Sequence, residues 1–149
     1  MGPLSSHIHQ YLLKYGYSYH VAPASSEFVT GFVVKGVSSG ISTVISAIEK
    51  DTYLIFDSGI LYDNSTIKDY VFMDAINCLN LQSPTCIKYF FKQSDSSVHS
   101  LMQIFISGTY PNEKFLDSVL HHTIQSLRDA FEKLEKLKIG AWQPKCSFD

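Results

Sequence analysis

The segment of residues 112–138 constrains the fold of this chain more than any other part. Its apolar residues follow one another at spacings of four, four, three, four and three, which places them on one stripe of an α-helix. Phe115 and Val119 widen this stripe, as expected for a helix that lies on a sheet rather than in a coiled coil. We therefore expect a helix of roughly 40 Å, at about 1.5 Å per residue, covering a small sheet. The stripe consists of Leu116, Leu120, Ile124, Leu127, Phe131 and Leu134.

Both ends of this helix carry local signals. Pro111 disfavours helical backbone at Tyr110, and the Asn112 side chain can accept backbone N–H bonds at a helix N-terminus. Lysines collect near the other end, where positive charge opposes the helix dipole, and Gly140 can adopt the left-handed conformation that ends a helix. The sequence therefore predicts a helix bounded by Asn112 and Gly140.

The composition is that of a single globular domain. A chain of 149 residues with 45% hydrophobic and 17% charged residues is long and apolar enough to bury a core. We expect one domain over residues 1–149, with a globular core at about 5–138 and a tail at 139–149. The net charge of −2 provides no basic field that would favour nucleic acid or an anionic membrane.

The cysteines favour a reducing compartment. Cys78, Cys86 and Cys146 show no C-x-x-C spacing, and an odd number cannot all pair within one chain. None lies at an expected helix N-terminus, where a thiolate would be stabilised, so we expect buried structural thiols. No stretch approaches the roughly 20 apolar residues of a spanning helix, and the first residues lack a secretory signal, so the expected location is the cytoplasm.

Two further helices are expected. Ser5 or Ser6 can cap a short first helix, and Gly16 can end it. A second helix, with its apolar residues three or four apart, begins at Asn64 or Ser65 and closes at residues 81–84.

The remaining segments are expected to be strands and connections. Residues 57–59 are interpreted as an irregular passage, and SDSSVHS at residues 94–100 as a polar connection. Segments rich in β-branched and aromatic residues predict strands at residues 17–21, 27–37, 41–49, 52–56, 86–93 and 101–107.

The expected order is helix, three or four strands, helix, two strands, helix. Because strands and helices are grouped rather than strictly alternating, we predict an α+β fold with a mainly antiparallel sheet and helices packed on one face. The opposite face of such a sheet is left open to solvent or to a partner.

No catalytic, cofactor or metal motif accompanies this pattern. His121 and His122 are adjacent, so they diverge by about 100° on a helix and cannot share a metal comfortably. His7 and His9 also lack the spacing of metal ligands, and the glycine-containing turns are too poor in glycine to cradle a phosphate. We therefore expect no catalytic residues, no cofactor and no metal.

Aromatic residues offer a better candidate for function. Several occupy alternate positions in the expected strands, so their rings can lie on the sheet face away from the helices, where aromatic side chains often mark contact sites. The alternative is that strand curvature and loops cover them. The lone tryptophan, in the tail, can fold back over the core or join a partner. The candidate partner-binding residues are Tyr17, Tyr19, Tyr53, Tyr89, Phe91 and Trp142.

Several segments together resemble a known family. GFVVKG before the expected hairpin, the helix DYVFMDAINCLNLQSP, the strands CIKYFFKQ and LMQIFIS, and the helix start YPNEKFLDSVLHH are similar to the YbjN-like domain and its type III secretion chaperone-like fold. The resemblance covers about residues 5–138. It implies a sheet with helices on one face, no catalysis, no cofactor, and, as in secretion chaperones, a homodimer that holds an extended protein client.

Two functional hypotheses follow. The first is a non-enzymatic, dimeric protein-binding domain that holds a protein partner through a sheet face or edge. The second is a small-molecule binder or cryptic enzyme, with a pocket between the long helix and the sheet that contains His121 or His122 and a carboxylate. Nucleic-acid binding is disfavoured by the charge balance.

Overall fold

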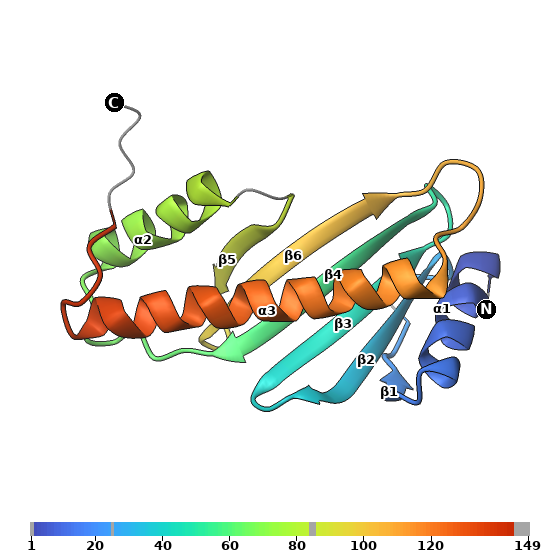
Figure 1. The fold of residues 1–149 in the computed structure, drawn as a ribbon, viewed down its shortest axis with the longest axis horizontal. Helices are drawn as coiled ribbons and strands as arrows, with labels where there is room; N and C mark the ends of the chain where they lie inside the picture. Colours follow the sequence, from blue (N-terminus) through green and yellow to red (C-terminus); the bar gives the residue numbers. More distant parts are fainter. Residues whose placement is uncertain (1, 25, 84–85, 145–149) are drawn as a thin grey trace.

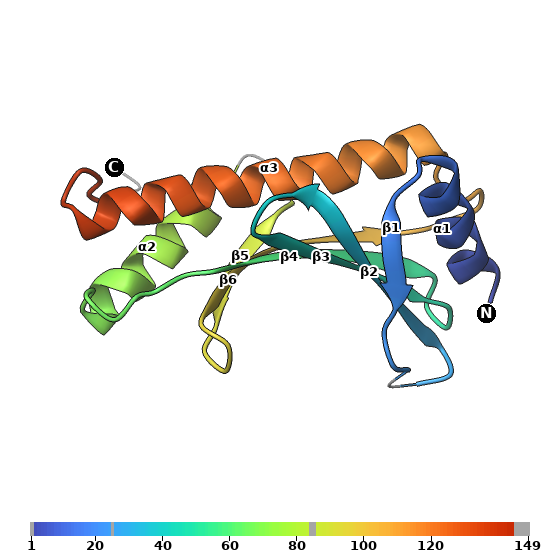
Figure 2. The same cartoon turned by 90° about the horizontal axis from the view of Figure 1, so that it is seen from below.

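The computed structural model describes residues 2–24, 26–83 and 86–144. Three helices lie on one side of a six-stranded sheet (Figures 1 and 2). The elements in chain order are α1 (Pro3–Lys14), β1 (Ser18–Val21), β2 (Val29–Ser38), β3 (Ile41–Ile48), β4 (Tyr53–Leu61), α2 (Asp69–Gln82), β5 (Lys88–Lys92), β6 (Ser97–Phe105) and α3 (Glu113–Lys138).

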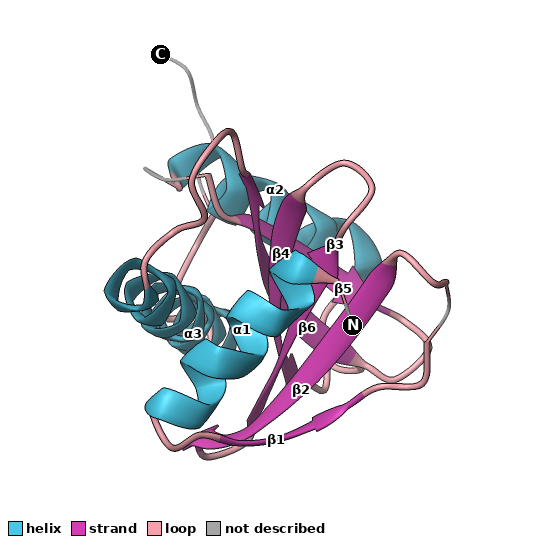
Figure 3. Cartoon of the chain, turned by 90° about the vertical axis from the view of Figure 1, so that its right-hand side faces the viewer, coloured by secondary structure: helices cyan, strands magenta, loops and turns pink. Residues whose placement is uncertain are grey.

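All strand pairs are antiparallel, and the strand order is β1-β2-β3-β4-β6-β5. The long helix α3 crosses one face of the sheet and contacts β4 and β6, while α1 lies at the β1 end and α2 lies beside β5 (Figures 2 and 3). The predicted α+β architecture, with its antiparallel sheet and long C-terminal helix, is confirmed.

The core lies between α3 and the sheet. Leu116, Leu120, Leu127 and Leu134 are fully buried, as predicted from their spacing. They pack in one apolar cluster with side chains from the facing strands, which include Phe32, Ile45, Leu54 and Phe56. Burial of this stripe on the sheet is what stabilises α3, since isolated helix pairing contributes only a few tenths of a kcal/mol per pair, about 0.2 to 0.5.

The ends of α3 follow their local signals. The Asn112 side chain accepts a hydrogen bond from the Phe115 N–H at 2.8 Å, and Gly140 has a φ of 72°. The predicted N-cap and helix stop are therefore confirmed.

The start of α1 differs from the prediction of a Ser5 or Ser6 cap. The helix begins at Pro3, and its free N–H groups are bonded by the carboxylate of Glu49, which follows β3. Glu49 accepts from the Ser5 N–H at 2.7 Å, the Ser5 hydroxyl at 3.0 Å and the Leu4 N–H at 3.3 Å. A carboxylate at a helix N-terminus also opposes the helix dipole. This cap comes from 44 residues away, so local sequence could not predict it.

Two strands are longer than predicted. β4 continues through residues 57–59, which were interpreted as irregular, and β6 begins at Ser97 within the segment interpreted as a polar connection. Both interpretations were wrong because the polar residues of these segments alternate with buried ones, such as Ser58 and Val98, and face the side without helices. α2 also begins later than predicted, at Asp69.

The described cysteines do not fit the expectation of buried thiols. Cys78 is buried on α2 but is disulfide-bonded, whereas Cys86 is a free, exposed thiol. Cys146 lies outside the described residues. Over the part of the chain that the structure describes, no helix combines the length and apolar character needed to cross a bilayer.

Candidate functional site

The sheet face without helices is the main candidate surface. The pairing register places one set of alternate strand residues under the helices and the other set on this uncovered side, which we call the open face. Its middle is apolar although no helix covers it. The apolar residues of the open face are Val29, Val33, Val44, Ile48, Tyr53, Ile55, Leu61, Phe90, Leu101 and Phe105.

An aromatic pair forms one end of the open face. Tyr53 of β4 lies opposite Phe105 of β6, with their ring centroids 5.6 Å apart. Phe105 is 73% exposed, which is unusual for a phenylalanine at the end of a central strand. Aromatic rings that remain exposed beside aliphatic neighbours are typical of contact surfaces.

A hydrogen-bonded network forms the other end, which we call the polar corner; it consists of Asp57, Asp95, Ser97 and His99. His99 Nδ1 lies 2.7 Å from Asp57 Oδ1, and His99 Nε2 lies 2.7 Å from the Ser97 hydroxyl oxygen. Ser97 donates its own hydroxyl hydrogen to Asp95 at 2.5 Å. This bond is the main cause that holds the pKa of the Asp95 carboxyl below its usual value.

The position of His99 is set by its neighbours in the sheet. Phe90 of β5 stacks on the imidazole with ring centroids 4.8 Å apart. On β4, Gly59 lies directly opposite His99, and the ring passes over its Cα. Beside the ring, a hollow of about 240 Å³ is lined by the small residues Gly40, Ser42 and Gly59 together with the polar corner.

Ser97, His99 and Asp57 are connected in the order of a nucleophilic triad, but the hydrogen bonds do not support that chemistry. A nucleophilic serine must give its proton to the histidine. In the arrangement that the structure shows, the Ser97 hydroxyl hydrogen is donated to Asp95 and not to His99, so the Ser97 oxygen is not activated in this arrangement. Among the described residues, no group of three or more His, Cys, Asp or Glu side chains is placed to hold a metal ion. The polar corner is therefore a hydrogen-bonded network at the edge of the apolar surface.

Replacing Gly59 with alanine should displace His99 from this network. A Cβ at position 59 would lie 2.7 Å from His99 Cε1, well inside contact distance, and Phe90 stacks on the same ring. We expect Gly59→Ala to lower the free energy of unfolding by about 1 to 3 kcal/mol, as for other overpacked sites. Chemical denaturation measures this change, and loss of the Asp57 contact is visible in the NMR signals of the His99 ring.

Gly31→Ala is the matched control for this substitution. Gly31 lies on the open face of β2, and a Cβ there would approach no atom closer than 3.4 Å. This variant should change the free energy of unfolding by less than about 0.5 kcal/mol. Equal effects at the two glycines would contradict the role given to Gly59.

The β5 edge of the sheet is closed by a side chain. Asn80 of α2 donates to the Tyr89 carbonyl at 2.9 Å and accepts from the Tyr89 N–H at 2.7 Å. The Asn80 amide thus forms the two bonds that a further strand would form with Tyr89. This contact leaves little room for strand addition at that position.

The β1 edge is open but short. Ala22 N–H bonds to the Gly31 carbonyl, so by the antiparallel pattern His20 also pairs with β2, while Tyr19 and Val21 direct their N–H and C=O groups outward. Only these two residues of the four-residue strand face a potential partner strand, and Pro23 follows. Short edges followed by proline are a common protection against strand addition. The sheet edges are therefore weaker candidates than the open face.

Most of the aromatic residues proposed from the sequence lie on the helix-covered side. Tyr17 donates to Asp117 of α3, Tyr19 bonds to His9 of α1 at 2.5 Å, and Tyr89 donates to the Ser126 carbonyl of α3 at 3.5 Å. Phe91 packs against Phe72 of α2 with ring centroids 5.0 Å apart. For Tyr17, Tyr19, Tyr89 and Phe91, a position on the uncovered face was wrong. Tyr19, Tyr89 and Phe91 point at the helices by the parity of their strands, and Tyr17 precedes β1 and bonds to α3. Their part in binding a partner stays a prediction.

The other two proposed residues lie elsewhere. Tyr53 is on the open face, as expected. Trp142 is partly buried and packs against the core, so the tail folds back over the domain at this residue.

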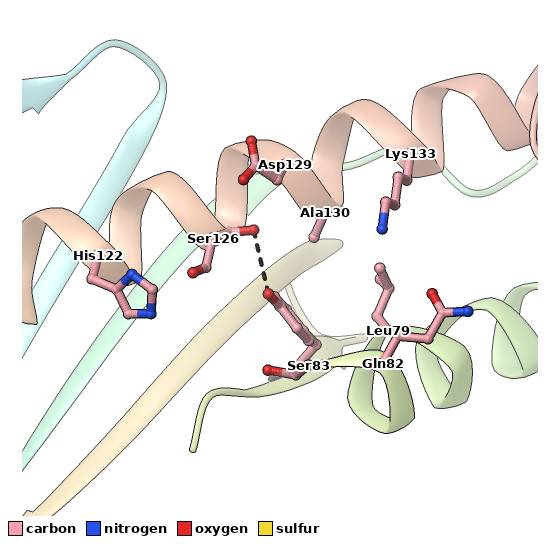
Figure 4. A pocket seen from close by; sticks show the side chains of 9 residues that line it. Leu79, Gln82, Ser83, His122, Ser126, Asp129, Ala130 and Lys133 are labelled. Atoms are coloured by element: carbon pink, nitrogen blue, oxygen red, sulfur yellow. Dashed lines mark hydrogen bonds between the residues drawn. The ribbon is translucent and has the colours of Figure 1, made fainter. Parts of the chain in front are cut away.

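The second hypothesis placed a pocket under the long helix. The core there is filled by buried side chains, but a groove of about 240 Å³ lies between α3 and the end of α2 (Figure 4). His122, Asp129 and Lys133 of α3 line one wall of this groove, and Leu79 and Gln82 of α2 line the other. His121 is outside it and contacts Asp117 at 3.5 Å. A small-molecule site would therefore lie beside α3 rather than beneath it.

The element order, the strand order and the uncovered face define an α+β domain with the YbjN-like, type III secretion chaperone-like fold, as the sequence resemblance implied. Three solved structures share it. YbjN, a proposed transcription regulator from E. coli, superposes with a TM-score of 0.64 at 13% identity over 97% of both chains. An uncharacterized protein from Methanothermobacter thermautotrophicus gives a TM-score of 0.65 at 13% identity over 89% of this chain and 97% of the other.

A chain of the ExsC–ExsE complex has the same fold with a TM-score of 0.55 at 10% identity, over 99% of this chain and 100% of the other. No family model matches the sequence, and no curated protein matches it. At such low identities these similarities establish the fold alone.

Sequence reasoning missed the residues that distinguish the open face. Phe105, Asp57, Ser97, His99 and Asn80 were not singled out because three of them fell in segments interpreted as irregular. One signal was available: Ser97, His99 and Leu101 alternate with Val98 and Ser100, which is the period of a strand with one covered face.

Proposed function

We propose that this protein is a non-enzymatic protein-binding domain whose contact surface is the open face. The observation that carries this proposal is the uncovered apolar middle of the face, which ends in the exposed Tyr53–Phe105 pair. An apolar sheet surface beside a polar border is the composition that protein interfaces commonly have. Among the described residues, no group of three or more His, Cys, Asp and Glu side chains is placed to hold a metal ion, and Ser97 donates to Asp95 rather than to His99, so an enzymatic alternative has weaker support.

The fold and the sheet edges support this proposal from different directions. The ExsC–ExsE complex, which contains a chain of the same fold, is an assembly of two proteins. The Asn80 contact at β5 and the short β1 strand favour the face over the edges as the contact surface.

We propose further that the protein forms a homodimer and does not bind nucleic acid. Light scattering tests the first point, and salt-dependent binding to DNA or RNA would contradict the second.

A cytoplasmic location is also part of the proposal. The free, exposed Cys86 thiol supports a reducing compartment, and the disulfide at Cys78 argues against it. Alkylation of the protein isolated under non-reducing conditions, followed by mass spectrometry, shows whether Cys78 is in a disulfide or is a free thiol.

The double substitution Tyr53→Ser and Phe105→Ser should abolish partner capture. Exposed aromatic residues at the centre of an interface commonly contribute more than 1 kcal/mol each, so we expect binding to weaken by at least about tenfold. The measurement is affinity capture from cell extract, with partners identified by mass spectrometry and affinities then measured with the purified partner. Both rings are partly exposed, so the fold should persist.

Phe115→Ser serves as the matched control for this test. Phe115 is 47% exposed on the opposite side of the molecule, on α3. A partner that the wild type and Phe115→Ser retain but the double variant loses would support the open face. A partner lost only with Phe115→Ser would place the contact on the helical side and contradict the proposal.

A further inference from the structure

The polar corner contains more hydrogen-bond contacts than a neutral histidine can satisfy. Three contacts join its four side chains, from Asp57 to His99, from His99 to Ser97 and from Ser97 to Asp95. Ionised carboxylates only accept, so Asp57 requires a hydrogen on His99 Nδ1, and Asp95 takes the single hydroxyl hydrogen of Ser97. The Ser97 oxygen then has to accept a hydrogen from His99 Nε2. All three bonds are made only when both ring nitrogens of His99 carry hydrogens.

Loss of one proton from His99 breaks one of these bonds. His99 keeps the hydrogen on Nδ1, which donates to Asp57, because a carboxylate is a stronger acceptor than a hydroxyl. The bare Nε2 then becomes an acceptor 2.7 Å from the Ser97 oxygen, and the Ser97 hydroxyl must turn toward it to avoid facing lone pairs. Asp95 thereby loses its bond to Ser97.

We propose that the protonation state of His99 switches the polar corner between two hydrogen-bonded states and so controls which groups the open face presents to a protein partner. The part of this inference that concerns a partner rests on the proposed function. The switch itself does not, because it lies within the chain and is measured without a partner.

The charged groups around His99 define what each state presents. Asp57 of β4 bonds to the ring, Asp95 bonds through Ser97, and the Lys92 ammonium of β5 lies 3.9 Å from Asp95. Lys88 also lies on β5, opposite Leu101 of β6. Farther across the open face lie Lys35 of β2, separated from His99 by β4 and β3, and His20 of β1, which is separated from it by β2 as well.

Protonation changes both the charge and the accessible acceptors of the polar corner. With His99 protonated, the two carboxylates are balanced by the imidazolium and by Lys92, and every donor hydrogen within the network is used. With His99 neutral, one negative charge remains, and Asp95 Oδ1, which had accepted from Ser97, becomes a free acceptor at the rim of the hollow, while Lys92 stays near Oδ2. The neutral state therefore favours a partner that presents a cationic or N–H donor group at this corner, and the protonated state disfavours it.

NMR spectroscopy of the full chain between about pH 5.5 and 8.5 tests this switch, since histidines change charge in this range. We expect both His99 ring nitrogens to carry hydrogens at low pH and only Nδ1 to carry one at high pH. The carboxyl ¹³C signal of Asp95 should shift together with the His99 ring, because Asp95 stays ionised throughout. As the pH rises, hydrogen exchange of the amides in residues 94–96 should become roughly tenfold faster beyond the intrinsic pH effect and approach the rate in Ser97→Ala, which lacks the bond to Asp95 at every pH.

Three variants make the test decisive. Ser97→Ala keeps the His99–Asp57 contact but removes the connection to Asp95, so the Asp95 signal should no longer follow the titration of the ring. Asp95→Ala removes the acceptor of the Ser97 hydroxyl and is the second break in the same connection if Ser97→Ala unfolds; exchange of the amides in residues 94–96 should then not follow the His99 ring. His20→Asn removes the other histidine of the open face and should change nothing.

A neutral His99 with its hydrogen on Nε2 would overturn the proposal, as would an Asp95 signal that follows pH equally in Ser97→Ala and wild type. Either result would leave the protein-binding function intact, because that function is tested by Tyr53 and Phe105. If the Tyr53 and Phe105 double variant lost capture and the switch were absent, the open face would be supported as the contact surface. Only its regulation by His99 would be rejected.

Discussion

Replacing Leu127 with alanine should lower the free energy of unfolding by about 2 to 5 kcal/mol, the range for large-to-small substitutions in a packed core. Leu127 is fully buried on the apolar stripe of α3, in the cluster that joins the helix to the sheet. Alanine is at least as good a helix former as leucine, so the loss comes from the cavity and not from helix propensity. At roughly 2 to 4 °C per kcal/mol for a chain of this size, the melting temperature should fall by about 4 to 20 °C.

Phe115→Ala on the same helix is the control for the Leu127 prediction. Phe115 is 47% exposed, so its truncation removes much less buried surface. We expect a loss of about 1 kcal/mol or less. Urea denaturation of both variants measures the difference. If the two losses were equal, α3 would not be held by its buried stripe, and the arrangement of the core would be wrong.

The long helix could be predicted because its signals are local and redundant. A period of 3.6 residues, an N-cap at Asn112 and a stop at Gly140 all indicate the same element. The grouping of strands and helices likewise predicted the antiparallel sheet with one covered face. Burial of an apolar stripe needs no knowledge of the partner strands, only that such strands exist.

The candidate surface was harder to predict because it depends on pairing between distant strands. Asp57 and His99 are 42 residues apart and meet only because β4 pairs with β6. In the sequence, Asp57 opens the turn-like tripeptide DSG and His99 lies near the end of the polar stretch SDSSVHS, so each is typical of a loop. The hydrogen bond between Asp57 and His99 satisfies these polar side chains within the sheet. Local propensity cannot predict such a bond.

The sequence also could not predict on which face of the sheet each aromatic side chain lies. A shift of one residue in register moves a whole strand's side chains to the other face, so alternation alone cannot say which set is covered. Tyr17 and Tyr89 point toward α3 because hydrogen-bond partners on that helix, Asp117 and the Ser126 carbonyl, accept from them. Burial accordingly raises the pKa of both tyrosine hydroxyls above the ordinary value.

Replacing Asn80 with alanine should both destabilise the protein and open its β5 edge. Two hydrogen bonds to the Tyr89 main chain are lost, at 2.9 and 2.7 Å, and each such bond contributes about 0.5 to 1.5 kcal/mol. The expected loss in the free energy of unfolding is therefore about 1 to 3 kcal/mol. The Tyr89 amide should also exchange its hydrogen faster, because no protein acceptor replaces the Asn80 oxygen.

The uncovered edge gives Asn80→Ala a second, concentration-dependent effect. Unpaired N–H and C=O groups on an edge strand are a template for pairing with another chain. The pattern of pairing between β5 and β6 directs the main-chain groups of Phe91 outward as well, so two residues of the strand become available. We expect self-association of the variant in light scattering at concentrations where the wild type keeps a constant mass.

Asn77→Ala separates these effects from a general weakening of α2. Asn77 is exposed almost one turn earlier on the same helix, so the substitution changes the helix without touching Tyr89. Asn80→Asp completes the set, since aspartate keeps the acceptor for the Tyr89 N–H but places a second acceptor against the Tyr89 carbonyl. If Asn80→Ala kept the slow Tyr89 exchange and the constant mass, the amide would not be what closes this edge.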